Sequence, residues 1–506
     1  MELLVSLILI TLATLFLAWL GVVGRKKPHP LPPGPPADPI IGHVRHIPTK
    51  SPELTYMQWG KQFNTDIIYM SLLGQGVIIL NKAEDAIALL DRRGSKYSDR
   101  PRFHFFQEQG WIKSLTLFSP GPAFRKHRKM YTASFTPAKC VQYQKAQIQE
   151  AGKLARRVMD NPEDWMLQTV AYSTAVVLQI AYGIEVKGKD DPYVKLANDV
   201  SESISTSGAV GVTMVDVLPF TRNLPNWFRL IPSLNWARSL IPVIREMHEL
   251  PYEYVKSQMV NSSLSSALPF EAKGFCHRQS TAATISIFVL AMVLSPDVQQ
   301  KAHAEIDAVV GVDRLPTFAD RPNLPFVEKV LQELFRWHSS VPLSNCADVL
   351  DILDIPHIVT EDDEYKGYLI PKGKCSTYIT SYDSRAFVIA NSYAINRDEC
   401  RYNNPASFNP DRYTPITEGG EGAPQPVGQF GFGRRICPGQ HLGEASVWAA
   451  IVTTLATLEI SKARDSNGEL SAPDPKFSTG LTSHAERFPC VIKRRSERAR
   501  ELLVNL

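Results

Sequence analysis

A ten-residue stretch near the C-terminus, Phe-Gly-Phe-Gly-Arg-Arg-Ile-Cys-Pro-Gly at residues 430–439, constrains this chain more than any other part of its sequence. Its glycines permit positive φ angles and close backbone approach, so the stretch is predicted to form a tight loop. Apolar residues at helical spacing follow Gly439, which places Cys437 just before the N-terminus of a helix. The free N–H groups of that helix end and the nearby Arg435 favour a thiolate over a thiol. The pattern predicts a loop that presents one sulfur as a ligand; a buried, inert cysteine is the alternative.

Residues 430–439 fill every fixed position of Phe-x-x-Gly-x-Arg-x-Cys-x-Gly, and the stretch therefore resembles the haem-binding loop of the cytochrome P-450 family. The resemblance implies that Cys437 is the axial thiolate ligand of the iron of haem b, which promotes O–O cleavage. It also implies a mainly α-helical fold with a minor β region. The resemblance covers nearly the whole chain. In general likeness the sequence is most similar to fungal microsomal members of the family, including those of secondary metabolism.

The composition is that of a globular protein in a reducing compartment. Of the 506 residues, 44% are hydrophobic and 21% are charged. The net charge of +4 is too small to indicate nucleic acid as a partner. The seven cysteines are odd in number and form no Cys-x-x-Cys pair, which argues against a disulfide framework or a structural zinc site. A cytosol-facing location fits this pattern.

The N-terminus carries a candidate membrane anchor. Residues 3–24 contain no charged residue, and about 20 apolar residues in a helix cross a bilayer core of roughly 30 Å. The basic run Arg25-Lys26-Lys27 follows, so the positive-inside rule places the rest of the chain in the cytosol. A cleaved signal peptide is the alternative, but its basic residues would precede the apolar run. In the endoplasmic reticulum membrane we expect a single-pass transmembrane anchor at 1–24, a basic and proline-rich hinge at 25–45 and a cytosolic haem-binding catalytic domain at 46–506.

Two further positions, with Arg435, match the family's contacts to the haem propionates. Phe124 and Arg128 stand in the places of Trp-x-x-x-Arg, and the resemblance implies that Arg128 pairs with a propionate. A solvated basic face is the alternative for this segment. Phenylalanine in place of tryptophan removes an indole donor but keeps the aromatic packing. By the same resemblance Arg435 neutralises a propionate and His357 is a further candidate, for which a satisfied surface histidine is the alternative.

A charge triad is expected to hold the cysteine loop. Glu333 and Arg336 are three residues apart in a predicted helix, so they share one face. They match the family's Glu-x-x-Arg, and residues 408–413 resemble its Pro-Glu-Arg-Phe element. The resemblance implies that Arg412 completes the triad, in a structural role. Earlier in the chain, alternating residues on both sides of Gly74-Gln75-Gly76 predict a β-hairpin at 66–81.

The predicted central helix departs from the family pattern. The family's Ala/Gly-Gly-x-Asp/Glu-Thr-Thr falls on Cys276–Thr281, so the glycine is lost and Gln279 replaces the acid. In the family an acid–alcohol pair delivers protons to bound oxygen, a task that needs an ionisable or hydroxyl proton in position. Ser280 or, one residue further, Thr281 is the candidate catalytic alcohol.

Three segments interrupt the family pattern, at residues 262–281, 345–354 and 375–387. The first is too short for the first half of a long central helix and contains Pro269, while the other two read as insertions. Imperfect exon boundaries in a predicted gene would explain all three; real divergence with altered chemistry is the rival hypothesis. Transcript sequencing across codons 262–390 distinguishes the two.

The function predicted from these features is a haem-thiolate monooxygenase that oxidises a small, lipophilic organic substrate with O2. We expect electrons from a membrane-bound NADPH–cytochrome reductase, because the chain has no Gly-x-Gly-x-x-Gly fingerprint for a flavin or nicotinamide cofactor. The lost acid keeps two alternatives open. One is a haem-thiolate isomerase or dehydratase without O2 activation, and the other is an inactive haem-binding protein.

Overall fold

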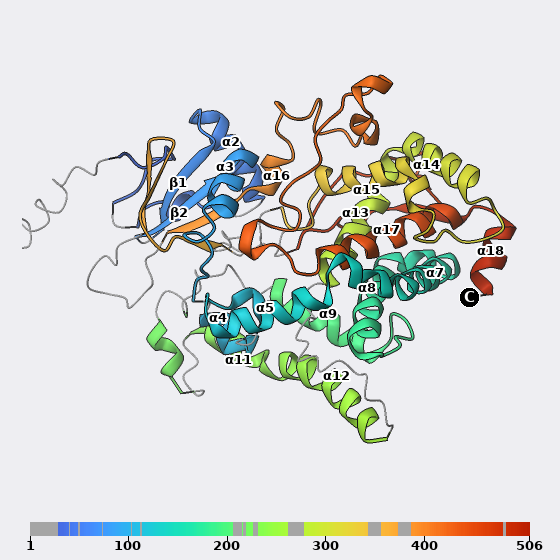
Figure 1. Cartoon of the computed structure of the whole chain (residues 1–506), viewed down its shortest axis with the longest axis horizontal. Coiled ribbons are helices and arrows are strands. Elements are labelled where there is room, and N and C mark those ends of the chain that lie inside the picture. Colours follow the sequence, from blue (N-terminus) through green and yellow to red (C-terminus); the bar gives the residue numbers. More distant parts are fainter. Residues whose placement is uncertain are drawn as a thin grey trace, which may run out of the picture.

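The structure is a computed structural model that describes residues 29–505, apart from residues 40, 49–50, 73, 103, 112–113, 206–214, 216–218, 226–230, 262–277, 343–355, 373–385 and 479–481. Helices make up most of the molecule, and the longest β strands gather at one end (Figure 1). The predicted mainly α fold with a minor β region is confirmed. The expected anchor at 1–24 lies outside the described residues, as do most of the three interrupting segments.

No single helix in the described part of the chain combines the length and the hydropathy that a membrane span requires. One pair of helices, Ser280–Leu294 and Pro296–Val309, has the required length and hydropathy only when taken together, across a bend of 104°.

Six helices supply most of the largest hydrophobic core of the described residues. The central one, α13, is apolar on all sides, and every residue from Ile285 to Val293 is at most 5% exposed. A helix of that kind belongs inside a large core, where other helices surround it. The six are α7 (Gln144–Asp160), α8 (Trp165–Tyr182), α13 (Arg278–Leu294), α14 (Pro296–Val309), α15 (Pro325–Trp337) and α17 (Gln440–Thr457).

The longest strands belong to a four-stranded sheet. Its order is β1-β2-β6-β3, with strands β1 (Ile67–Leu72), β2 (Gln75–Leu80), β6 (Phe387–Ala390) and β3 (His357–Ile358). The antiparallel β1–β2 pair is the predicted hairpin, and Gly74 turns it with a φ of +88°. Strand β3 runs antiparallel to β6, which places His357 opposite Val388. Two further antiparallel pairs are β4 (Asp363–Tyr365) with β5 (Tyr368–Ile370), and β7 (Leu458–Lys462) with β8 (Cys490–Arg494).

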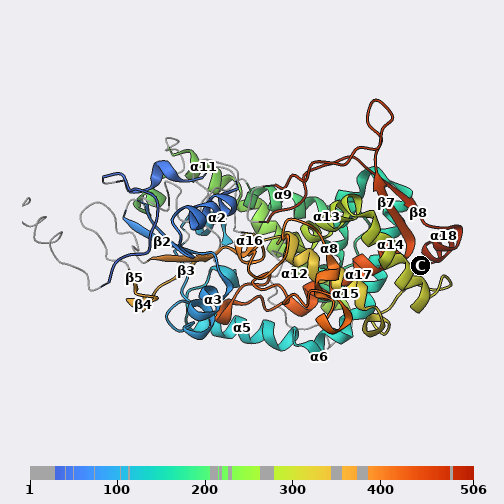
Figure 2. The same cartoon turned by 90° about the horizontal axis from the view of Figure 1, so that it is seen from above.

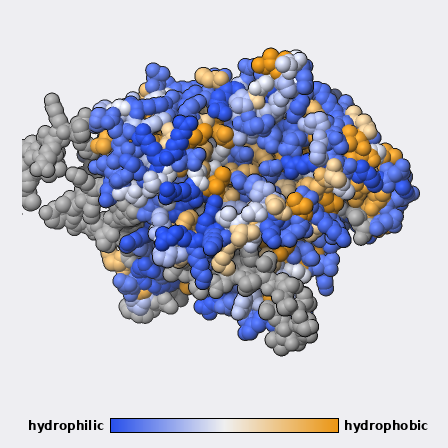
Figure 3. All heavy atoms as spheres, in the orientation of Figure 1, coloured by the Kyte–Doolittle hydropathy of each residue, from blue (hydrophilic) through white to orange (hydrophobic). Residues whose placement is uncertain are grey.

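The remaining helices cover these two parts. Helix α5 (Pro122–Ser134) runs along one long edge of the molecule, next to α6 (Figure 2). Hydrophilic residues dominate the face in Figure 3, with hydrophobic ones in small groups between them, as on a globular surface. The other helices are α2 (Pro52–Gln62), α3 (Ala83–Ala86), α4 (His104–Gln109), α6 (Pro137–Cys140), α9 (Pro192–Ser205), α11 (Pro232–Ser239), α12 (Ile241–Asn261), α16 (Ser392–Ile395) and α18 (Glu497–Val504).

The predicted charge triad is present and fully buried. Arg336 donates from Nε and Nη2 to the two carboxylate oxygens of Glu333 at 2.8 Å each, and Arg412 Nε donates to both at 3.1 Å. The other guanidinium N–H groups donate to backbone carbonyls between Asn396 and Ser407. Phe335, beside the triad, packs edge-on against Phe430 at the start of the cysteine loop. The triad therefore fixes the backbone between Asn396 and Ser407, while the Phe335–Phe430 contact joins α15 to the start of the cysteine loop.

Candidate active site

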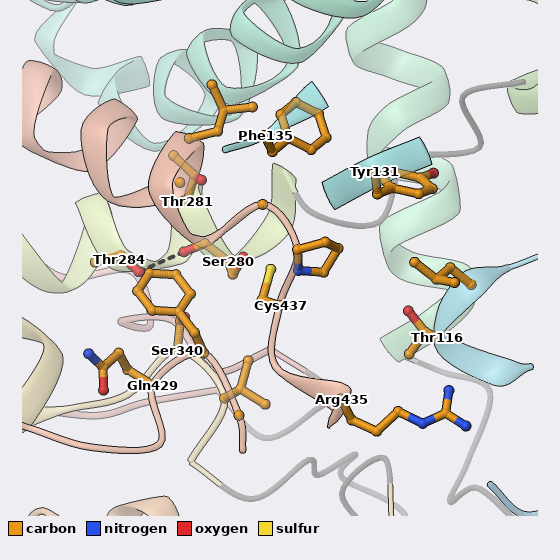
Figure 4. Close-up of a pocket in the computed structure, with 18 of the residues that line it drawn as sticks. Thr116, Tyr131, Phe135, Ser280, Thr281, Thr284, Ser340, Gln429, Arg435 and Cys437 are labelled. Atoms are coloured by element: carbon orange, nitrogen blue, oxygen red, sulfur yellow. Dashed lines mark hydrogen bonds between the residues drawn. The ribbon is translucent and has the colours of Figure 1, made fainter. Parts of the chain in front are cut away.

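A cavity of about 300 Å³ lies between the cysteine loop, α13 and the sheet. In Figure 4 the sulfur of Cys437 points into the space bounded by Ser280, Thr281, Tyr131 and Phe135. The structure brings every predicted site residue to the wall of this one cavity: Arg128, Ser280, Thr281, His357, Arg435 and Cys437.

The cysteine loop is as tight as its glycines predict. The N–H of Cys437 donates to the carbonyl of Phe430 at 2.8 Å and closes the loop on itself. Gly433 has a φ of +52°, and a Cβ there would lie 2.1 Å from the carbonyl oxygen of Leu90. No side chain fits at that distance, so glycine is required for the loop to rest on the π-helical turn Ile87–Arg92.

The surroundings of the Cys437 sulfur correct one expectation. Burial raises the pKa of the thiol and outweighs two lowering effects, a bond from the Gly439 N–H and the positive charge of Arg128. Helix α17 begins at Gln440, so the cysteine does lie at a helix N-terminus. The helix end alone does not produce a thiolate at this depth, because desolvation of the anion costs more. A bound metal cation deprotonates a coordinating thiol outright and would reverse the balance.

Arg435 is a half-buried cation whose terminal nitrogens have donors to spare. Its Nε donates to the carbonyl of Ser98 at 2.7 Å, and its guanidinium lies over the Phe124 ring, 3.9 Å from the centroid. Both terminal nitrogens, Nη1 and Nη2, are buried without a hydrogen-bond partner among the described residues. Burial lowers the pKa of Arg435 to about 10. The charge of the buried Asp99 opposes this shift only in part. A fork of two unpartnered nitrogens matches a carboxylate, which would compensate the rest of the buried charge.

Sequence reasoning missed the segment Tyr97–Arg100, which supports the cationic side of the cavity. Its successive carbonyls accept bonds from His357 Nδ1 at 2.6 Å, from Arg435 Nε and from the Ile358 N–H at 3.0 Å. Arg100 lines the cavity, and its Nη1 donates to the carbonyl of Pro356 at 2.8 Å. These partners lie more than 250 residues apart in the chain, so no local pattern could have revealed them.

His357 lies inside the molecule, and the surface-histidine alternative is wrong. Only 8% of the residue is exposed. Burial holds its pKa well below the ordinary value of 6.5, and the charges of Arg100 and Arg435 lower it further. The ring is therefore neutral at pH 7, and its bond to a carbonyl assigns the proton to Nδ1.

Three hydroxyl groups of α13 line the cavity. Ser280 and Thr281 were predicted, and Thr284, one turn further on, was missed. Thr284 Oγ1 donates to the carbonyl of Ser280 at 2.7 Å (Figure 4). The side chain of Gln279 lies outside the described residues, as do residues 345–354 and 375–385, so the departures in these places stay as hypotheses.

Comparisons with known proteins agree with this geometry. The sequence pattern of the cytochrome P-450 family matches residues 32–235 and 279–486. Cytochrome P-450 monooxygenase 176 of Postia placenta is 31% identical over 528 residues, covering 98% of this chain and 96% of the relative. Cytochrome P-450 monooxygenase claR of Ampulloclitocybe clavipes is 35% identical over 516 residues, with coverages of 97% and 90%. Tryptamine 4-monooxygenase of Psilocybe cyanescens is 32% identical over 503 residues, with coverages of 92% and 93%.

A solved structure shares the fold. The zebra fish cytochrome P-450 determined with abiraterone superposes with a TM-score of 0.66 at 19% identity. The match covers 88% of this chain and all of that one.

Proposed function

This chain belongs to the cytochrome P-450 family, and we propose that it is a haem-thiolate monooxygenase of a small, lipophilic organic substrate, in secondary metabolism. Members of the family act on small molecules with electrons from a partner reductase. The relatives above are named monooxygenases, so an isomerase, a dehydratase or an inactive protein is not favoured.

The cavity fits haem b, the cofactor of the family, whose iron carries an axial thiolate. The observation that carries the proposal is one sulfur facing the cavity beside a buried guanidinium with two unpartnered N–H groups. Cys437 would hold the iron, and Arg435, Arg128 and Arg100 would meet the two propionates. When bound, the haem supplies the one-electron and O2 chemistry that places one oxygen atom in the substrate.

The neutral ring of His357 can donate to a haem propionate only if its second nitrogen is protonated. Its Nδ1–H already donates to the Tyr97 carbonyl, so Nε2 is an acceptor. To donate to a propionate as well, the ring must take up a proton on Nε2. The carboxylate would favour that uptake by its charge, against burial and the two nearby arginines.

On the other side of the cavity we assign the α13 hydroxyls to hold water and pass protons. Ser280 Oγ and Thr281 Oγ1 are the candidate atoms, since both side chains line the cavity (Figure 4). Thr284 supports them by its bond to the Ser280 carbonyl. A hydroxyl group can relay a proton without being an acid. The two hydroxyls would therefore compensate in part for the carboxylic acid that Gln279 replaces.

We further propose a single-pass anchor at residues 1–24 that holds the catalytic domain on the cytosolic face of the endoplasmic reticulum membrane. The uncharged run followed by Arg25-Lys26-Lys27 supports this topology. The electron donor at that membrane would be an NADPH–cytochrome reductase.

The test of the proposed function is reductase-dependent oxidation. Full-length protein, reductase, NADPH and a library of lipophilic compounds are incubated under 18O2, and products are analysed by mass spectrometry. We expect a product that carries one 18O atom and that requires both NADPH and reductase. The Cys437→Ser variant is the control and should give none. Turnover of a peroxide without reductase would support the isomerase alternative and contradict the proposal.

A further inference from the structure

Phe124 and Arg435 come from different elements and meet face to face. Phe124 lies in the first turn of α5, and Arg435 ends the short 3-10 turn Gly433–Arg435 of the cysteine loop. The guanidinium carbon lies 3.9 Å from the centroid of the half-buried ring. Both residues line the cavity. The contact therefore ties α5 to the loop at the wall of the proposed haem site.

The ring holds the cation without using any of its donors. An aromatic face attracts a guanidinium through the negative charge of its π-system. The Nε of Arg435 is bonded to Ser98, which fixes one edge of the fork. The ring covers the guanidinium carbon, and Nη1 and Nη2 have no hydrogen-bond partner among the described residues.

We propose that Phe124 is a positioning residue of the haem site, which holds Arg435 flat so that both terminal nitrogens meet one propionate. The inference rests on the proposed function, because it needs a bound haem. A phenyl ring has no hydrogen-bond donor, so Phe124 would not bond the haem itself. Its effect on haem binding passes through Arg435.

Haem retention by the full-length holoprotein tests this role. The rate of haem transfer to excess apomyoglobin is compared between the wild type, Phe124→Leu and Phe124→Tyr. Phe124→Leu should lose haem about 2- to 30-fold faster, the range that corresponds to one cation–π contact. Phe124→Tyr keeps the ring and should match the wild type within about twofold. Phe118→Leu is the matched control, since its ring lies against His127 and not against a guanidinium, and its rate should not change.

A second background separates positioning from packing. In the Arg435→Gln variant the ring has no cation to hold, so adding Phe124→Leu should not accelerate haem loss further. Equal acceleration in both backgrounds, or no difference between Phe124→Leu and Phe118→Leu, would overturn the inference. If Phe124→Leu unfolds by far-UV circular dichroism, Phe124→Met takes its place. A wild type without bound haem would contradict the proposed function, whereas failure of the inference leaves the wild-type spectrum unchanged.

Discussion

At the scale of one residue, the unpartnered nitrogens of Arg435 indicate that the ligand of the cavity carries an anionic group. The chain buries a guanidinium, leaves two of its nitrogens unpartnered and lowers its pKa to about 10. Asp99 compensates the buried charge only in part, so a second anion at the two nitrogens would stabilise it further. Arg434, next to Arg435, is exposed and shares the loop. Variants of Arg435 and Arg434 therefore distinguish how a charge with buried nitrogens and an exposed charge of the same loop affect haem binding.

The Arg435→Gln variant should bind haem about 10- to 160-fold more weakly, because it loses charge-assisted hydrogen bonds worth roughly 1.5–3 kcal/mol. Arg434→Gln should bind haem as the wild type does. Haem titration of the two apoproteins, followed at the Soret band, measures both affinities. Equal weakening in both variants would show that loop charge, and not the fork of Arg435, attracts the propionate.

His338 provides a test by pH at the same scale. The ring is 3% exposed, stacks on Phe477 at 3.6 Å, and its Nε2 bonds the Ser483 hydroxyl at 2.8 Å. Burial lowers its pKa from 6.5 to about 3. Between these two values the unfolded chain binds a proton that the native chain does not. Its contribution to stability is thus complete above pH 6.5 and is lost as the pH falls toward 3.

We expect the free energy of unfolding of the wild type to fall between pH 6 and pH 4 more steeply than that of His338→Gln. The difference approaches about 1.4 kcal/mol per pH unit, the value for one proton. Urea unfolding at several pH values measures the two slopes. Parallel slopes would mean that His338 is protonated in the native state.

At the scale of elements, the cysteine loop depends on its contact with the turn Ile87–Arg92. Gly431 and Gly433 both have positive φ, +79° and +52°. A Cβ at Gly431 meets nothing closer than 3.9 Å, whereas one at Gly433 would collide with the Leu90 backbone at 2.1 Å. Substitution of Gly431 therefore tests the positive φ alone, whereas substitution of Gly433 tests the positive φ together with the close contact to Leu90.

Both glycine-to-alanine variants should lose about 1–2 kcal/mol from the left-handed backbone. Gly433→Ala must also move the loop away from Leu90, and we expect it to retain little haem. Gly431→Ala should retain most of it. The ratio of haem to protein after purification measures this difference. Similar ratios would show that the loop does not need its contact with Leu90.

Local patterns predicted some elements and could not predict others. The loop, the hairpin and the shared face of Glu333 and Arg336 follow from residue types and spacing, whereas Arg412 was expected only from the resemblance to the family. The role of the segment Tyr97–Arg100 does not follow from local patterns, because the groups that donate to its carbonyls lie more than 250 residues further along the chain. The direction of the Cys437 pKa was also missed, since burial of a sulfur depends on the whole fold.

At the scale of the molecule, the proposed anchor and the catalytic domain are separable. A chain that starts at residue 29 should remain in solution, while the full-length chain should float with vesicles of neutral phospholipid in a density gradient. The neutral lipid excludes attraction by basic surface residues. Flotation of both chains would mean that the folded domain itself binds the membrane, and flotation of neither would refute the anchor.

The central claim is that Cys437 holds haem iron as a thiolate, and the absorption spectrum of the reduced full-length protein under carbon monoxide tests it most directly. We predict the strongly red-shifted Soret band of thiolate-ligated haem in the wild type. The same band should persist in Cys400→Ser, which changes an exposed free cysteine, and disappear in Cys437→Ser. A wild-type band of neutral ligation, absence of haem, or persistence of the red-shifted band in Cys437→Ser would contradict the account.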